Sequence, residues 1–173
     1  FVVSAEGGTP RQLTFNTTGD TLANWTPDGQ HILFASSRGN HPFLNPLYRV
    51  PVAGGVPVAL DIDQGATGAI SPDGTKLAFN RNRTPTTRKH YRGNLQADIW
   101  VQDLRSSEIT QITDTDPKQH RTHVHEGDPM WGADGRIYYT SERSGAFNVW
   151  SIAPDGSGAT QVTNHERDGA QNA

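Results

Sequence analysis

The sequence predicts an all-β chain built from repeated units of four antiparallel strands, and three observations support this prediction. An Asp-Gly turn joins the first two short apolar segments of each of three units, at Asp28, Asp73 and Asp134. A second pair of apolar segments, joined by a turn that contains Gly or Ser, follows each of them. No stretch of ten or more residues has the 3.6-residue apolar period of an amphipathic helix. We therefore expect helix to contribute little to this fold.

The first pair of segments in each unit is typical of a β-hairpin. Each pair has β-branched or aromatic residues after its turn, and the three pairs cover 23–36, 68–80 and 128–141. Asp-Gly suits a tight hairpin, because Gly tolerates a positive φ and Asp hydrogen-bonds to its own backbone. The second hairpins turn at 54–55, 106–107 and 155–156. The sequence thus predicts four strands in each unit.

The spacing of these units matches that of a β-propeller blade, which takes about 40–50 residues. We expect three whole blades, at 20–60, 65–113 and 124–163. The segment 1–14 is predicted to end one further blade, and the segment 164–173 to begin another. Closed propellers have about 4–8 blades, so this count favours a part of a longer polypeptide. The absence of an initiator Met favours the same interpretation. The open sheet edges predict that isolated copies associate.

Composition excludes several classes of site and partner. The 173 residues contain no Cys, which excludes disulfides, thiolate zinc sites and cysteine nucleophiles. The net charge of −3 does not provide the excess of positive charge that is typical of nucleic-acid-binding proteins. No apolar run approaches the roughly 18–20 residues of a membrane span. No signal peptide is visible at the N-terminus, and the sequence leaves a cytoplasmic or a periplasmic location open.

The most informative departure from the repeat is a basic insertion at 81–97. It contains five Arg or Lys residues and no acidic residue, a formal charge of +5. Blade topology places it on the face that carries the long loops, and a loop of this length is usually functional or interfacial. Arg clusters suit carboxylate or phosphate partners. The candidate binding residues are Arg88, Lys89, His90, Tyr91 and Arg92. The alternative is a solvated loop, or a loop that docks on an acidic neighbouring blade.

A group of imidazoles and carboxylates raises a metal hypothesis that the spacing does not favour. Its members are His120, His123, His125, Glu126 and Asp128. The pattern His-Glu-x-x-His is absent, and His120 lies in a loop that contains Pro. We therefore expect a polar loop between blades, with no metal and no cofactor.

The sequence presents no catalytic set. It has no Gly-x-Ser-x-Gly elbow and no glycine loop that would cradle a phosphate. All four tryptophans lie on predicted strands. Trp25 and Trp131 occupy one matching position of the repeat, and Trp100 and Trp150 occupy another. We expect them to pack between blades: Trp25, Trp100, Trp131 and Trp150.

Three segments resemble a known family of propellers. The string Trp-Thr-Pro-Asp-Gly-Gln at 25–30 is similar to the Pro-Asp repeats of TolB, of prolyl oligopeptidase relatives and of tricorn-type proteases. The string Arg-Lys-His-Tyr-Arg-Gly at 88–93, followed by Asp-Ile-Trp-Val at 98–101, resembles the Trp-Lys-x-Tyr-Arg-Gly-Gly…Ile-Trp segment of tricorn propellers. Arg88 stands where that family usually has Trp, and Asn94 where it has a second Gly. The segments 122–131 and 136–145 also resemble tricorn propellers, in the expected order.

The resemblance implies the N-terminal, six-bladed propeller of a tricorn-like serine peptidase. The catalytic residues of that family lie in C-terminal domains, so no catalytic residue is carried over to this chain. The implied role is to guide or filter peptides and to support assembly of the enzyme, with peptides or the peptidase body as partners and a homo-oligomeric parent. Two alternatives remain open: a TolB-like propeller that binds a protein partner, and the propeller cap of a prolyl-oligopeptidase-like hydrolase.

Overall fold

A computed structural model describes residues 1–38, 45–82, 96–113 and 124–167, and within them every regular element is a β-strand. The strands form three antiparallel sheets of four, which we call blades 1, 2 and 3. Blade 1 contains β1 (Asp20–Trp25), β2 (His31–Ser36), β3 (Leu47–Pro51) and β4 (Val58–Ala59). Blade 2 contains β5 (Gly68–Ile70), β6 (Lys76–Asn80), β7 (Ile99–Asp103) and β8 (Ile109–Gln111). Blade 3 contains β9 (Glu126–Trp131), β10 (Ile137–Ser141), β11 (Asn148–Ile152) and β12 (Thr160–Gln161).

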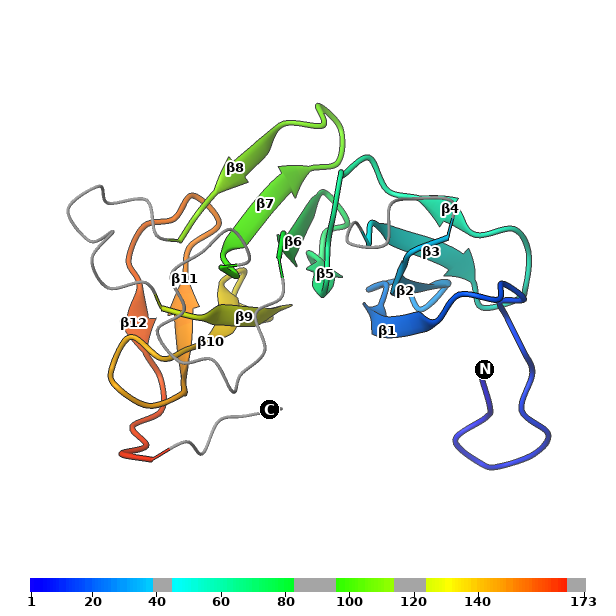
Figure 1. The fold of residues 1–173 in the computed structure, drawn as a ribbon, viewed down its shortest axis with the longest axis horizontal. Coiled ribbons are helices and arrows are strands. Elements are labelled where there is room, and N and C mark those ends of the chain that lie inside the picture. The colour runs from blue at the N-terminus through cyan, green and yellow to red at the C-terminus, as the bar shows by residue number, and fades with distance from the viewer. Residues whose placement is uncertain (39–44, 83–95, 114–123, 168–173) are drawn as a thin grey trace.

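The predicted partial β-propeller is confirmed. Each sheet runs in simple sequence order from its first strand to its fourth. The blades follow one another in chain order, and the first strand of blade 2, β5, lies between β1 and β9 (Figure 1). None of the described segments forms a helix with the length and apolar character that a membrane span requires.

The Asp-Gly turns form the hairpins for the reason that the sequence suggests. Gly29, Gly74 and Gly135 adopt φ angles of 67°, 72° and 77°, which side chains larger than hydrogen rarely tolerate. Each turn joins the first and second strands of its blade, and the second strands contain the apolar residues of the core. The turns therefore fix where each blade begins to fold back on itself.

The core lies between the blades, because successive residues of a strand point to opposite sides of the sheet. Leu77 and Phe79 of β6 pack with Leu33 and Leu47 of blade 1. Ala78, between them in β6, packs with Ile99, Val101 and Ile112 of its own blade and with side chains of blade 3. Those blade 3 side chains are Ile137, Tyr139 and Ile152. Blade 2 thus uses both of its faces as core.

Blades 1 and 2 approach closely at a glycine. A Cβ atom on Gly68 would lie 2.8 Å from Cδ1 of Leu47 and 3.0 Å from the carbonyl oxygen of Ala78. The first strand of blade 2 therefore accepts no side chain at this position without displacing its neighbours.

Polar contacts join blades 2 and 3. The Asn80 side chain at the end of β6 donates from Nδ2 to the Glu126 carbonyl at 2.7 Å, and its Oδ1 accepts the Asp128 amide at 2.9 Å. One side-chain amide thereby satisfies two backbone groups of β9. Farther along the same strand, Trp131 Nε1 donates to the Ala69 carbonyl of β5 at 2.9 Å. These contacts fix the register of β9 against blade 2.

The tryptophan prediction is confirmed for three residues, and the fourth is half-buried among the described residues. Trp100 packs against the cluster between blades 1 and 2, whereas Trp131 and Trp150 pack against the cluster between blades 2 and 3. Trp25 is 45% exposed. It lies outside the small cluster on the other side of blade 1, where Leu13 packs with Phe34 and other residues of that blade. Trp25 occupies the position of Trp131 in the repeat and pairs with Ile32, which packs in the cluster on the side of blade 1 away from blade 2.

The N-terminal segment contacts blade 1 without forming a regular strand pair. A single bridge joins Val2 and Arg11, and Leu13 is buried. The Arg11 guanidinium donates to the carbonyls of Val52 and Ala53 in the turn between β3 and β4. The N-terminal segment thus contacts blade 1 through Leu13, which packs on β2 and β3, and through Arg11 at the turn after β3.

Candidate functional site

The candidate site is the loop face, which we define as the face with the loops between second and third strands and the crossings between blades. The predicted binding residues Arg88, Lys89, His90, Tyr91 and Arg92 fall outside the described residues, so that binding site stays a prediction. The structure does describe both ends of the insertion. We call these ends the insertion root: Arg81, Asn82, Gln96, Ala97 and Asp98.

In blade 1 an arginine of the loop face pairs with an acid and lies over two aromatic rings. Arg38 lies two residues after the end of β2, and its Nη2 contacts Asp20 Oδ2 at 2.5 Å while Nε donates to Ser36 Oγ at 3.0 Å. The guanidinium lies over the rings of Phe34 and Tyr48, 4.8 and 5.2 Å from their centroids. Burial is the largest single influence and raises the pKa of Asp20, but the hydrogen bonds with Arg38, Ser36 and Thr14 and the charge of Arg38 together outweigh it and leave this pKa below its usual value.

Blade 3 repeats this arrangement with a more buried acid. Arg143 lies two residues after the end of β10, pairs with Glu126 and donates from Nε to Ser141 Oγ at 3.3 Å. Its guanidinium lies 4.9 Å from the centroid of the Trp150 ring. The Glu126 side chain is fully buried, whereas that of Arg143 is 27% exposed. Burial and then the charge of Glu126 raise the pKa of the neighbouring Tyr139 hydroxyl.

Blade 2 has the most exposed of these three arginines, and it begins the insertion. Arg81 directly follows β6, pairs with Asp63 and lies 5.0 Å from the centroid of the Trp100 ring. The two charged side chains are 38% and 53% exposed, so solvent screens this pair more than the pair in blade 3. Asp63 belongs to the crossing between blades 1 and 2. The charge of the insertion does not reveal Asp63 as the partner of Arg81, because Asp63 lies outside 81–97. The two acidic residues of this crossing, at 61 and 63, are the signal in the sequence that could have indicated such a pair.

The far end of the insertion lies at the junction of blades 2 and 3. Ala97 is buried, and its carbonyl accepts the Glu126 amide at 3.1 Å. Asn80 also donates to the Asp98 carbonyl, at 3.3 Å, besides its two contacts with β9. The insertion therefore leaves blade 2 beside the crossing from blade 1 and returns beside the first strand of blade 3.

The residues of the metal hypothesis have other partners where the structure describes them. His120 and His123 lie outside the described residues, whose carboxylates and imidazoles include no group of three positioned to hold a metal ion. The His125 amide donates to Glu142 Oε1 at 2.9 Å, and its ring meets the Phe147 ring edge-on. Glu126 is engaged by Arg143.

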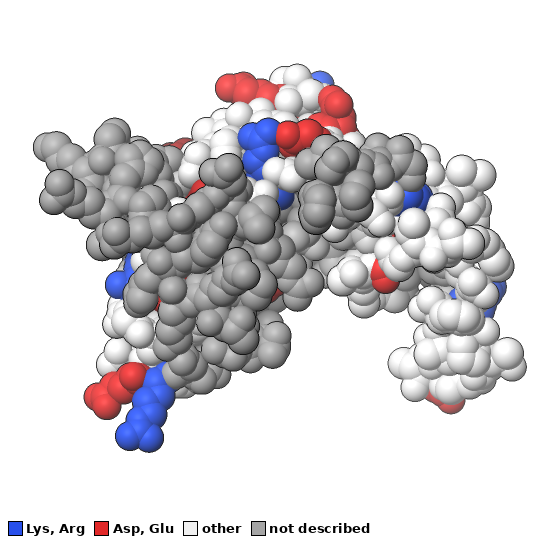
Figure 2. All heavy atoms as spheres, in the orientation of Figure 1, with Lys and Arg blue, Asp and Glu red and all other residues white. Residues whose placement is uncertain are grey.

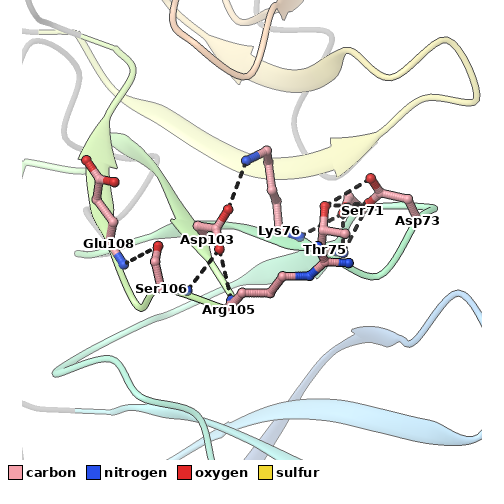
Figure 3. Close-up of polar contacts among 8 residues, drawn as sticks. All are labelled: Ser71, Asp73, Thr75, Lys76, Asp103, Arg105, Ser106 and Glu108. Atoms are coloured by element: carbon pink, nitrogen blue, oxygen red, sulfur yellow. Dashed lines mark hydrogen bonds and ion pairs between the residues drawn. The ribbon is translucent and has the colours of Figure 1, made fainter.

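The opposite face, which carries the hairpin turns, is built from aspartates that bind backbone amides. Asp103 Oδ1 accepts the Arg105 amide at 2.9 Å and the Ser106 amide at 3.1 Å, and Asp73 caps its own turn in the same way (Figure 3). Amide donors from Ser106 and Arg105, with a smaller effect of Lys76, lower the pKa of Asp103 to about 2. Similar turn contacts lower the pKa values of Asp28, Asp73, Asp134 and Asp155. These carboxylates stabilise the turns by accepting hydrogen bonds from backbone amides.

These depressed pKa values predict acid sensitivity with a defined sign. A carboxyl whose pKa is lower in the folded state stabilises the fold above its unfolded pKa of about 3.9, and this stabilisation is lost as pH falls toward the folded value. We expect the urea midpoint to fall between about pH 4 and pH 2, and to fall less in Asp103→Asn. The matched control is Asp61→Asn, an exposed aspartate outside the turns. An identical pH profile for wild type and Asp103→Asn would refute this role.

The visible charges do not form a patch of one sign. In the view of Figure 2, Lys or Arg atoms and Asp or Glu atoms lie beside one another near the top, where Figure 1 places β7 and β8. The described arginines of the loop face are likewise paired with acids.

Comparisons with known proteins agree with this architecture. A family model described as the tricorn protease N-terminal β-propeller domain matches residues 1–173. An uncharacterised protein of Agrobacterium fabrum is 26% identical over 181 residues, which cover 81% of this chain and 57% of that protein. The chain therefore spans little more than half the length of this curated relative.

Solved structures show the same fold at low identity. The crystal structure of a tricorn protease has a TM-score of 0.72 at 22% identity, over 94% of this chain and 16% of that one. A puromycin hydrolase has a TM-score of 0.59 at 16% identity, over 94% of this chain and 26% of that one. TolB from Acinetobacter baumannii has a TM-score of 0.56 at 18% identity, over 92% and 33%. Each of these similarities supports the propeller fold alone.

Proposed function

Because the chain belongs to the family of tricorn protease N-terminal β-propeller domains, we propose that it is the non-catalytic propeller portion of a serine peptidase, with a loop face that guides or filters peptides. The segments 1–14 and 164–173 then belong to neighbouring blades of the same ring. The partners of this portion are peptides and the peptidase body, within a homo-oligomeric parent.

The observation that supports this role most directly is the position of the insertion root. A segment of formal charge +5 begins at the crossing between blades 1 and 2 and ends against β9 of blade 3. The described arginines around it already have acid partners. We infer that the cations within 83–95 attract an anionic ligand on this face, which also carries Lys118 and Arg121 in the crossing between blades 2 and 3.

A peptide supplies such a ligand in its C-terminal carboxylate. Arg pairs with carboxylates through two parallel hydrogen bonds, and Lys acts as a compact charge. Attraction of this kind is long-ranged at low salt and is screened within about 10 Å at 0.1 M. Filtering by the loop face should accordingly favour peptides with a free C-terminus and should weaken as salt increases.

The test removes the predicted cations. We expect the triple variant Arg88→Ala, Lys89→Ala and Arg92→Ala to bind a fluorescent-labelled pentaalanine with a free carboxylate about tenfold more weakly, because three charge-assisted contacts are lost. Fluorescence anisotropy at several salt concentrations measures the affinity and its salt dependence. The same peptide with an amidated C-terminus is the control. Unchanged affinity and salt dependence in the triple variant would exclude this site.

A further inference from the structure

The crossing that leads into blade 1 contains an acceptor motif for N-linked glycosylation. Asn16-Thr17-Thr18 matches the pattern Asn-x-Ser/Thr, in which the asparagine carboxamide receives the sugar and a hydroxyl is required two residues later. The motif lies outside the strands and ends just before β1, and both Asn16 and Thr17 are exposed. Because a glycan is bulky and hydrophilic, a folded chain can accept one only at a surface segment of this kind.

The fold brings the two functional groups of this motif together. Asn16 Oδ1 accepts the backbone amide of Thr18 at 2.9 Å and the Thr18 hydroxyl, also at 2.9 Å. This arrangement is an Asx turn, in which the carboxamide oxygen takes the place of a backbone carbonyl. Asn16 Nδ2, the atom that would receive the sugar, donates to no group among the described residues. A Cβ atom on Gly19 would meet nothing within 4 Å, so the space beside the turn is open.

A second match to the same pattern, Asn24-Trp25-Thr26, is occupied by the fold. Asn24 lies within β1, and Thr26 is buried. The Thr26 hydroxyl donates to Asp28 Oδ1 at 2.6 Å and accepts the His31 amide at 2.9 Å, so it belongs to the first hairpin turn. Its hydroxyl and its asparagine are therefore both engaged in structure, whereas those of the motif at 16–18 stand at the surface.

We propose that Asn16 is an acceptor for an N-linked oligosaccharide, and that Asn24 is not an acceptor in the folded chain. In the transfer, Asn16 Nδ2 forms a bond to C1 of the first sugar and loses a proton. The bond from C1 to the diphosphate of a polyprenyl carrier breaks, and the polyprenyl diphosphate leaves with the electron pair. The co-reactant is thus a polyprenyl-diphosphate-linked oligosaccharide, used by an oligosaccharyltransferase. This modification is independent of the peptide binding proposed above.

The experiment presents the folded 173-residue chain to a purified oligosaccharyltransferase and its lipid-linked oligosaccharide. Mass spectrometry of the intact chain detects the added glycan, and trypsin then places it. The tryptic peptide 12–38 contains both Asn16 and Asn24, and it is separate from a third match at 82–84 that extends beyond the described residues. We expect wild type to gain a glycan on 12–38. Asn16→Gln should lose this glycan, and Asn24→Gln should keep it.

Two further variants test the hydroxyl of the motif. Thr18→Val removes the group that contacts Asn16 with little change of volume, and we expect it to lose the glycan. Thr17→Val is the matched control, because the middle position of the motif has no required side chain and Thr17 is exposed. It should be modified as wild type is. Urea midpoints of all variants at 16–18 should stay close to that of wild type, since this turn lies at the surface.

The isolated peptide 12–38 shows what the fold contributes. It contains both motifs without the strands, so we expect it to accept a glycan at Asn16 and at Asn24 alike, whereas the folded chain accepts one at Asn16. A folded wild type without a glycan on 12–38, or a glycan that persists in Asn16→Gln or Thr18→Val, would overturn the proposal. Modification of Asn24 in the folded chain would show that burial of the Thr26 hydroxyl does not select the acceptor, and would overturn its second part.

Discussion

Replacing Arg143 with Met should lower the free energy of unfolding by about 3–5 kcal/mol, the cost of leaving a buried charge without its partner. Glu126 is fully buried, and its Oε1 receives Arg143 and the Ser141 hydroxyl. Its other oxygen has no hydrogen-bond partner within the described part of the chain. Without the guanidinium, one hydroxyl would remain to solvate a carboxylate in the interior. Urea denaturation monitored by tryptophan fluorescence measures the loss.

The control for this prediction removes the charge from both partners. The double variant Arg143→Met with Glu126→Gln leaves no buried ion, so it should recover a substantial part of the stability that the single variant loses. The Glu126 backbone contacts with Ala97 and Asn80 are kept in both variants. If single and double variants are equally destabilised, the loss comes from packing of Arg143 on Trp150, and the buried charge is not its cause.

Phe79→Ala is expected to cost about 3–5 kcal/mol as well, through a cavity between blades 1 and 2. The Phe79 side chain has no exposed surface and packs with Leu33 and Leu47 of the neighbouring blade. The blades cannot close the cavity freely, because Gly68 already brings β5 against Leu47. Urea denaturation again measures the effect.

The matched control for Phe79→Ala is the same substitution at an exposed phenylalanine. Phe15 is 80% exposed, and Phe15→Ala should change the free energy of unfolding by no more than about 0.5 kcal/mol. Equal losses in the two variants would mean that the junction of blades 1 and 2 contributes no more to stability than the surface.

Much of the fold could be predicted because it depends on local chemistry. The turns at Asp28, Asp73 and Asp134 mark the first hairpin of each blade, and the alternation in 76–80 places Leu77 and Phe79 on one side of β6. Both signals come from residues within a few positions of one another. The family resemblance came from the strings at 25–30, 88–101, 122–131 and 136–145, and the family is shown by the match over residues 1–173.

The candidate site was less predictable, because its contacts join residues that are far apart in sequence. Asp63 and Arg81 are separated by a whole hairpin, and Asn80 meets Glu126 and Asp128 across the gap between two blades. Such pairs have no fixed spacing and give no periodic signal. Glu126 illustrates the limit: beside histidines in the sequence it suggests a metal ligand, whereas in the fold it is the buried partner of Arg143.

The sequence by itself determined that the chain consists of four-stranded blades with a basic insertion in the second, since strand alternation, turn chemistry and charge are properties of neighbouring residues. Only the tertiary structure decided which acid partners each arginine and which tryptophan stays exposed. Trp25 and Trp131 are equivalent in the repeat, but Trp131 meets the Ala69 carbonyl of the preceding blade and Trp25 is half exposed. The physical reason is that burial and ion pairing depend on the surface that a neighbouring blade presents, and that surface is set by packing.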